Sequence, residues 1–291
     1  MIHSMTGYAA GTRDLGSVVL GLELKSVNSR FIDLAFRMSE ELRSSEMPMR
    51  ELITARVTRG KLECRAYLQT QSTAKTDAKS AAPNAAAMAR LAQLQAGVRA
   101  ALPDAAPLSV NEILRWPGVL AEDTIAAETL QAETLALLDS VLAEFLATRE
   151  REGAKLAAVL LDIAAKMRAW VAQAEPLMPQ ALADYRERLA AKLREAVANL
   201  DEDRIRQEIG VFAAKIDVAE ELARLNTHLD ELERVLKKGG AVGKRLDFLM
   251  QELNREANTL ASKSVSAEIT AIALDLKLAI EQMREQVQNL E

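Results

Sequence analysis

The strongest constraint on this fold is a run of about fifty residues, from Thr124 to Glu175, that contains no proline and a single glycine. A typical globular helix is about 11 to 12 residues long, so the run predicts either a long antiparallel helical arm or two abutting helices. Pro176 and Pro179 follow and turn the chain back, because proline cannot donate a helix hydrogen bond. Aromatic residues make up only 3% of the chain while Ala, Leu and Glu are frequent, which favours long helices.

The first part of the chain has the alternation that is typical of half-buried strands. Residues 17 to 25 and 61 to 69 alternate apolar with polar side chains, which is the two-residue period of a strand. Residues 2 to 10 and 31 to 38 are further candidate strands, and residues 43 to 57 carry apolar side chains at helical spacing. The front of the chain is therefore predicted to be α+β.

The rest of the chain is predicted to form helices separated by short breaks. Residues 70 to 84 are small, polar and aperiodic and predict a loop, whereas a helix is predicted over residues 85 to 101 and a short one after an N-capping Ser109. Further helices are predicted over residues 180 to 200, 203 to 236 and 244 to 291.

We expect an α+β protein in three parts. A strand-rich α+β domain occupies residues 1 to 122, a long helical hairpin or arm residues 123 to 200, and a helical domain residues 201 to 291. A long arm cannot bury its apolar stripe on itself, and neighbouring subunits commonly cover such a stripe. The pattern therefore predicts a homo-oligomer.

Composition excludes several classes of protein. The formal net charge of −5 argues against a globally basic nucleic-acid binder but is compatible with a local basic patch. The single cysteine, Cys64, excludes an intrachain disulfide and a cysteine-rich zinc site. We find no signal-peptide pattern and no apolar stretch near the ~18 residues of a membrane helix, so we expect a cytoplasmic protein with no membrane partner. Motifs of serine hydrolases and dehydrogenases are absent from the sequence.

Acidic side chains gather on one face of the predicted helix 203 to 236. On a helical wheel of about 100° per residue, Asp217, Glu221, Arg224 and His228 fall within a narrow arc, opposite an apolar arc. Asp217 and Glu221 are like charges four residues apart, a spacing that destabilises a helix by about 0.2 to 0.5 kcal/mol unless a cation lies nearby. The arc predicts a neighbouring positive charge.

The next predicted helix repeats the arrangement, with Arg245, Glu252 and Glu256 on one stripe beside its apolar arc. If the two helices pack side by side, four carboxylates and one imidazole converge. Such an oxygen-rich ligand set suits Mg²⁺ or Mn²⁺ better than Zn²⁺. The pattern predicts a divalent metal site.

An ordinary explanation of the same carboxylates is exposed ion pairing of little energetic worth with Arg224, Arg255 and Lys263. A lone helical histidine such as His228 is more often a surface or a satisfied core residue than a catalyst. Spacing alone leaves both interpretations open.

Two groups of basic side chains could contact a polyanion. The segment from residue 236 to residue 245 joins the two acidic helices and contains Lys237, Lys238, Lys244 and Arg245 around a flexible Gly239-Gly240. It is not a nucleotide-binding P-loop, because Lys238 and Arg245 stand where Gly and Ser or Thr are required. In the front domain the cations that recur within about thirty residues are Arg30, Arg37, Arg43, Arg50, Arg56, Arg59 and Lys61. Solvated surfaces are the alternative in both places.

At these residues the sequence resembles the YicC/YloC family of stress-associated endoribonucleases. In the N-terminal part the resemblance is carried by MIHSMTGYA at residues 1 to 9, SVNSRFIDLAFRM at 26 to 38, TRGKLEC at 58 to 64 and ILRWPGVL at 113 to 120. Stronger motifs are IDVAEELARLNTHL at residues 216 to 229 and VGKRLDFLMQELNREANTLASKS at 242 to 264. The resemblance runs from end to end and is weakest over residues 70 to 90.

The resemblance implies a metal-dependent ribonuclease that assembles as a hexamer, with the N-terminal domain contributing to assembly and the helical part clamping RNA. The family's acidic and histidine positions fall on Asp217, Glu220, Glu221, His228, Glu252 and Glu256. Of these, we expect the five carboxylates to bind Mn²⁺ or Mg²⁺, and His228, Glu221, Glu252 and Glu256 to be catalytic, with His228 assisting proton transfer.

RNA is the expected substrate, held at its phosphates by cations from both parts of the chain. The residues expected to contact RNA are Lys237, Lys238, Lys244, Arg245, Arg255, Lys263, Arg30, Arg59 and Lys61. One rival function is a non-catalytic RNA-binding oligomer that presents RNA to another nuclease. Another is a structural helical scaffold without salt-sensitive affinity for RNA.

Overall fold

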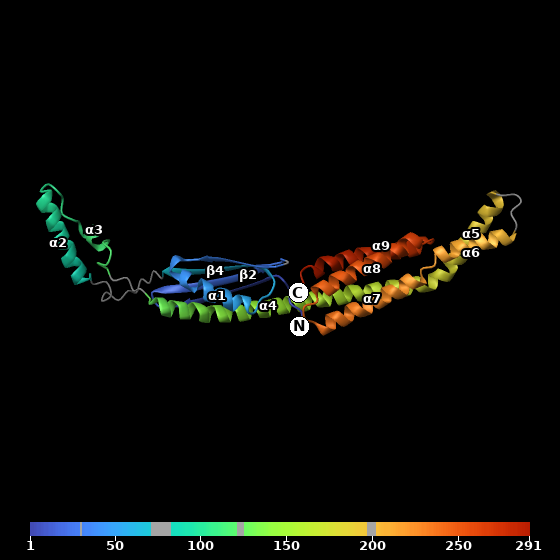
Figure 1. The fold of residues 1–291 in the computed structure, drawn as a ribbon, viewed down its shortest axis with the longest axis horizontal. Coiled ribbons are helices and arrows are strands. Elements are labelled where there is room, and N and C mark those ends of the chain that lie inside the picture. Colours follow the sequence, from blue (N-terminus) through green and yellow to red (C-terminus); the bar gives the residue numbers. More distant parts are fainter. Residues whose placement is uncertain (30, 71–82, 121–124, 197–201) are drawn as a thin grey trace.

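A computed structural model gives the fold of the chain and describes residues 1–29, 31–70, 83–120, 125–196 and 202–291. One long helix, α4 (Ala127–Ala174), connects two separate units. A β-sheet unit lies along its first half and a helical bundle along its second half (Figure 1). The predicted α+β class, with strands first and helices after, is confirmed.

The sheet has four strands in the order β1-β2-β4-β3, formed by β1 (Gly7–Asp14), β2 (Val18–Val27), β3 (Ile32–Met38) and β4 (Gly60–Thr70). Antiparallel pairing joins β1 to β2 and β2 to β4, whereas β3 runs parallel to β4. A crossover through the 3-10 helix η1 (Glu40–Ser45) and α1 (Glu46–Thr54) makes the parallel pairing possible.

The first strand begins later than the sequence predicted. Residues 2 to 5 do not join the sheet, because their backbone groups pair with more distant parts of the chain. The amide of Ser4 donates to the carbonyl of Arg149 at 2.9 Å, and Ser4 forms an isolated bridge with Leu290. The amide of Met5 donates to the carbonyl of Asn289 at 2.8 Å.

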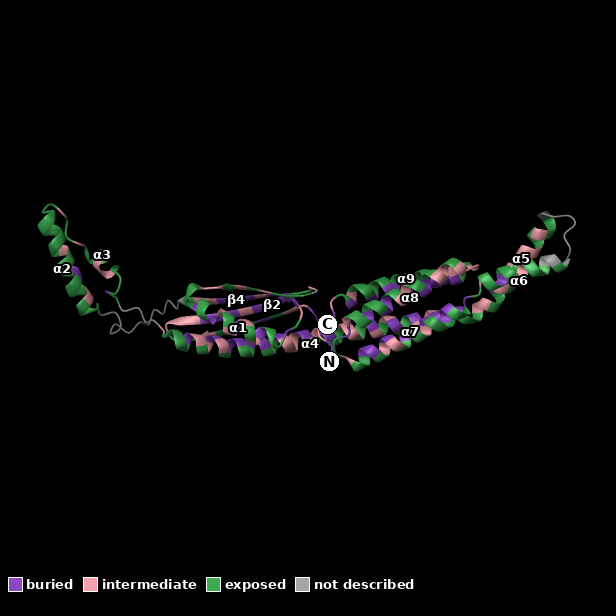
Figure 2. Ribbon diagram, viewed as in Figure 1, coloured by how far each residue is buried: buried purple, intermediate pink, exposed green. Residues whose placement is uncertain are grey.

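Helix α4 is one continuous helix of 48 residues, about 72 Å long at 1.5 Å per residue. The alternative of two abutting helices is therefore wrong, and the segment that returns along α4 is α7 (Ala219–Lys238). The first half of α4 packs Leu138, Leu142 and Phe145 against the sheet, and the second half of α4 packs Leu160 and Met167 against the bundle. Figure 2 shows buried residues along both halves. The chain itself thus covers the stripe for which the sequence predicted neighbouring subunits.

The bundle contains α7 together with α8 (Gly243–Lys263) and α9 (Ala267–Val287). Their leucine-rich faces and the second half of α4 enclose one apolar core. Figure 2 shows buried and exposed residues alternating along these helices. Beyond the bundle, η2 (Glu175–Leu177), α5 (Met178–Ala196) and α6 (Glu202–Lys215) lead the chain out and back.

Two predicted helices are interrupted. The helix expected over residues 203 to 236 breaks at residues 216 to 218, where Asp217 accepts a hydrogen bond from the amide of Ala219 at 3.0 Å. An aspartate that bonds the backbone two residues ahead competes with the helical ladder and starts a new helix instead. The helix expected over residues 244 to 291 breaks at residues 264 to 266.

Residues 83 to 120 form a small appendage that contains α2 (Ala85–Ala101) and α3 (Val110–Leu114). Both predicted helices are confirmed, and Ser109 caps α3 with Glu112 in a capping box. Most of the predicted loop before α2, residues 71 to 82, lies outside the described residues. Within the described ranges, no helix combines the length and the apolar character that crossing a membrane requires.

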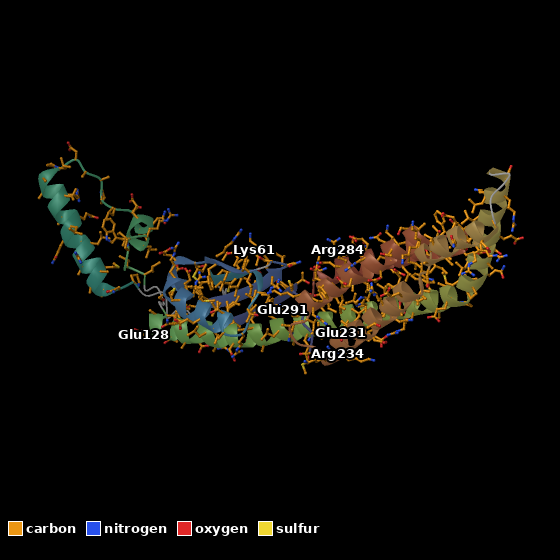
Figure 3. All side chains as sticks on the ribbon, turned by 45° about the vertical axis from the view of Figure 1, so that its right-hand side comes forward. Lys61, Glu128, Glu231, Arg234, Arg284 and Glu291 are labelled. Carbon is orange, nitrogen blue, oxygen red and sulfur yellow. The ribbon has the colours of Figure 1, made fainter. Side chains whose placement is uncertain are left out.

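Residues from both ends of the sequence meet at the middle of α4, between the two units (Figure 1). The Arg149 side chain is 2% exposed there, donates to the carbonyl of Ser4 and pairs with the carboxylate of Glu291. The amide of Glu291 donates to the carbonyl of His3 at 2.9 Å. We call this contact region the junction, and Figure 3 shows Glu291 at it, between the sheet and the bundle.

Candidate metal centre and nucleic-acid interface

The candidate metal centre lies between α7 and α8, which pack side by side. His228 faces α8 from α7, and Glu252 and Glu256 face α7 from successive turns of α8. One ligand atom from each of the three side chains lies within 4.8 Å of the others. Metal–ligand bonds of about 2.0 to 2.2 Å hold neighbouring ligand atoms closer together than this limit, so the side chains would move toward one another to close the site.

The centre has more negative than positive charge within it. Glu256 is 3% exposed, and His228 and Glu252 are half-buried. The guanidinium of Arg224 approaches the cluster, with Nη1 at 3.6 Å from Oε1 of Glu256. Among the described residues, no ion-pair partner reaches Glu252. Two close carboxylates with one neighbouring cation keep a net negative charge, which favours a bound metal ion.

The other predicted ligands do not belong to this cluster. Asp217 precedes α7 and binds a backbone amide, because the helix breaks there. Glu220 pairs with Arg224 along α7. Glu221 is 4% exposed, and its Oε1 accepts from Nζ of Lys263 at 2.9 Å.

Ordinary ion pairing therefore explains part of the acidic arc, as the alternative interpretation expected. Lys263 neutralises Glu221 and also donates to the carbonyl of Asp217 at 3.0 Å. The second oxygen of Glu221 is buried and has no hydrogen-bond partner within the described ranges. Arg255 lies on the exposed side of α8. The structure thus separates Glu252, which has no ion-pair partner among the described residues, from Glu220 and Glu221, which pair closely with Arg224 and Lys263. Glu256 is intermediate, with Arg224 at 3.6 Å.

The basic turn between α7 and α8 lies at the junction. Gly239 and Gly240 have φ of 68° and 90°, so both adopt the left-handed conformation that glycine favours. The amide of Gly240 donates to the carbonyl of Met1 at 3.0 Å. This contact fixes the turn while leaving Lys237, Lys238 and Lys244 exposed.

Arg245 is held by Glu231, whose carboxylate also binds Arg234. The distance from Arg245 Nη2 to Glu231 Oε1 is 3.1 Å, and Arg234 Nε lies 2.6 Å from Glu231 Oε2. Hydrogen bonds from Arg234 first, and from Arg245 as well, lower the pKa of Glu231 to about 2. Figure 3 shows Glu231 and Arg234 close together near the junction.

Cations that are distant in sequence meet in a groove between the sheet unit and the first turn of α8. Arg59 and Lys244 both line this groove, which has a volume of about 420 Å³ and includes Asn28 and Asp247. The amide nitrogen of the Asn28 side chain donates to the carbonyl of Gln288 at 2.6 Å. Lys61 is exposed on the sheet (Figure 3), and Arg30 lies outside the described residues.

One exposed aromatic residue near the centre was absent from the sequence-based set. Phe248 is 47% exposed and lies one turn before Glu252 on α8. The guanidinium carbon of Arg245 lies 5.6 Å from the centre of its ring. A phenylalanine off the apolar arc of an amphipathic helix was the signal that could have identified it.

Two family models match this chain, and together they span nearly all of it. The model described as "Endoribonuclease YicC-like, N-terminal region" matches residues 2–158, and "Endoribonuclease YicC-like, C-terminal" matches residues 174–291.

Two curated relatives match along their full length. A protein of Haemophilus influenzae named "Probable endoribonuclease YicC" is 40% identical, with 100% of both chains covered. A protein of Clostridioides difficile with the same name is 26% identical, again over 100% of both chains. The suspected resemblance is thereby confirmed, and the chain belongs to the family of YicC-like endoribonucleases.

Proposed function

We propose that this protein is a metal-dependent endoribonuclease that uses His228, Glu252 and Glu256 to hold a divalent cation. The observation that carries the proposal is the approach of their ligand atoms to within 4.8 Å in a half-buried, acidic setting. The names of the two relatives support RNA as the substrate.

The residues present fit such a cation. Two carboxylates favour Mg²⁺ or Mn²⁺, and the imidazole shifts this preference toward Mn²⁺ because nitrogen ligands suit transition metals. A bound cation would supply Lewis-acid stabilisation of the negative charge that develops on the scissile phosphate. Glu252 and Glu256 would fix its position from adjacent turns of one helix.

The chain's own residues account for binding the polyanion. Arg59 and Lys244 meet in the groove at the start of α8, and Lys237 and Lys238 extend the basic surface past the junction. Each phosphate contact would release counterions, so affinity for RNA should fall steeply as salt concentration rises. Arg224 lies beside Glu256 and would position that carboxylate.

The proposal extends to the setting of the reaction. We expect cleavage in the cytoplasm, by a homo-oligomer and specifically a hexamer, as the family resemblance implies. The measured mass of the purified protein in solution tests the hexamer. A monomeric mass at micromolar concentration would contradict the proposal that an oligomeric assembly clamps the RNA.

Glu252→Gln and Glu256→Gln test the catalytic proposal. Each variant should lose Mn²⁺ binding in calorimetry and RNA cleavage in a Mn²⁺ titration, because an amide oxygen is a much weaker metal ligand than a carboxylate. Retained helicity and retained RNA binding would show that folding is intact. Glu281→Gln is the matched control, since Glu281 is an exposed glutamate on α9 paired only with its helix neighbour Arg284.

The outcomes separate the candidate functions. Full cleavage by both site variants would exclude this metal centre. Salt-sensitive RNA binding without cleavage at any metal concentration would favour the adaptor that presents RNA to another nuclease. Analysis of the product ends would distinguish hydrolysis from attack by the ribose 2′-hydroxyl.

A further inference from the structure

One side of α8 carries an ordered series of chemically different side chains, which runs from exposed residues at its start to a buried carboxylate at its end. Lys244, Phe248, Glu252 and Glu256 stand at four-residue intervals, so they lie on successive turns and form one slowly winding row. The row begins at the groove that contains Arg59 and ends in the candidate metal centre. Phe248 is the only one of the four without a polar group.

Phe248 is held in place although its ring is open to solvent. The ring is 47% exposed, and the guanidinium of Arg245 covers part of it at 5.6 Å. Arg245 is in turn fixed by Glu231 at 3.1 Å. An aromatic ring next to an anchored guanidinium is a flat, partly desolvated surface of the kind on which nucleobases stack.

The distances along the helix suit one nucleotide beside the metal centre. Four residues advance about 6 Å along an α-helix, so Phe248 lies about 6 Å before Glu252 and the same distance after Lys244. Lys244 and Arg245 lie within the four residues before Phe248 on α8, and their positive charges are complementary to RNA. The acidic Asp247 is hydrogen-bonded by Gln251 at 3.0 Å.

We propose that Phe248 stacks an unpaired nucleobase adjacent to the scissile phosphate, so that the substrate of this site is RNA that is single-stranded at the cut. The inference rests on the proposed function, which places the scissile phosphate at Glu252 and Glu256. A base within a duplex stacks on its neighbours and cannot present its face to a protein ring. Phe248 is therefore a positioning residue that selects unpaired RNA.

The test compares Phe248→Ala with Phe248→Trp in binding to fluorescein-labelled oligoadenylate, oligouridylate and a duplex of the same length. Chelator is present, so no cleavage occurs. In other proteins that bind single strands, replacing one stacking aromatic residue with alanine raises Kd by about 5- to 150-fold. We expect a loss in this range for Phe248→Ala on single strands, near wild-type affinity for Phe248→Trp, and no change on the duplex.

Phe212→Ala is the matched control. Phe212 is 38% exposed on α6 and has Lys215 at 5.3 Å from its ring, but it lies on a different helix from the metal centre. Its variant should bind each RNA like the wild type. Equal affinities of Phe248→Ala and Phe212→Ala, or a Phe248→Ala effect that is as large on the duplex, would overturn the proposal.

Two further readouts complete the design. Solution mass of Phe248→Ala must match the wild type, because a changed oligomeric state would assign the ring to a contact between copies and overturn the inference. Cleavage by the wild type in Mn²⁺ is measured in parallel. If the wild type binds through Phe248 but does not cut, the proposed nuclease function fails while the stacking site stands.

Discussion

Cys64 illustrates how placement on a strand decides the chemistry of a side chain. It lies on β4 with its thiol in the core of the sheet unit, fully buried, and burial raises its pKa to about 12. A thiol is reactive only as the thiolate. We predict that a disulfide reagent such as DTNB leaves Cys64 unmodified at pH 8 in the native protein and titrates one thiol in denaturant. Rapid labelling of the native protein would show that the sheet unit opens.

Glu231 should contribute to the acid sensitivity of the fold. Its folded pKa of about 2 lies below the ordinary value of 4.5, so the ionised carboxylate stabilises the folded state above about pH 4.5. That stabilisation is lost as pH falls through about 2. We predict that the free energy of unfolding of wild type falls more steeply from pH 4.5 to pH 2 than that of Glu231→Gln. Parallel curves from denaturant titrations would contradict the prediction.

At individual residues, helical spacing predicted the centre only where the helix is continuous. Glu252 and Glu256 are four residues apart within α8, and His228 lies well inside α7, so their shared faces followed from the sequence. Asp217 fell on the same wheel but lies before the helix begins. The pairing of Glu221 with Lys263 depended on the relative position of two helices, which spacing within one helix does not determine.

At the scale of elements, α4 has one position where packing overrides helix propensity. Alanine normally stabilises a helix by about 0.8 to 1 kcal/mol relative to glycine. A Cβ on Gly153, however, would lie 2.2 Å from the carbonyl oxygen of Ile2. We predict that Gly153→Ala destabilises the protein by about 1 to 3 kcal/mol, because the obstacle is backbone, and that thermal unfolding shows a lower Tm.

Gly97→Ala on α2 is the matched control for that substitution. Beyond α2 itself, no atom of the described residues lies within 4 Å of the position that a Cβ would take at Gly97, so propensity alone should act and Tm should not fall. A Gly153→Ala variant as stable as this control would mean that the N-terminal segment does not pack against α4.

Some boundaries of helices and strands could be predicted from the sequence, and others could not. The absence of proline from residues 127 to 174 allowed one long helix, and the capping residue Ser109 identified the start of α3. The late start of β1 could not be predicted, because Ser4 pairs with Leu290. Alternation also gave no sign that β3 is parallel to β4. The start of β1 depends on a contact with residues at the other end of the sequence, and the direction of β3 depends on how the chain crosses over between β3 and β4.

At the scale of the whole molecule, the two cores share α4 and are expected to unfold together. Leu22 is fully buried in the sheet core, so Leu22→Ala should cost about 2 to 5 kcal/mol. Trp170 packs against the other core. In a Trp116→Phe background, we predict that Leu22→Ala lowers the thermal transition that Trp170 fluorescence reports.

Leu94→Ala provides the comparison, since Leu94 is 51% exposed on α2 and belongs to neither core. Its transition should coincide with that of the Trp116→Phe background. A Trp170 transition that is unchanged by Leu22→Ala would show that the sheet unit and the bundle melt independently. The division into domains at residues 122 and 200 remains a prediction, and α4 contributes side chains to both units.

The pairing of Ser4 with Leu290 and of Arg149 with Glu291 has a consequence for biosynthesis. The ribosome synthesises Leu290 and Glu291 after Ser4 and Arg149, so Arg149 can bond the carbonyl of Ser4 but lacks the Glu291 carboxylate while the bundle is still being translated. The nascent sheet unit can form its own core early, but its contacts with Leu290 and Glu291 can form only after those residues have been synthesised. The contacts of the junction, beside which the basic turn lies, are thus among the last that the described chain can make.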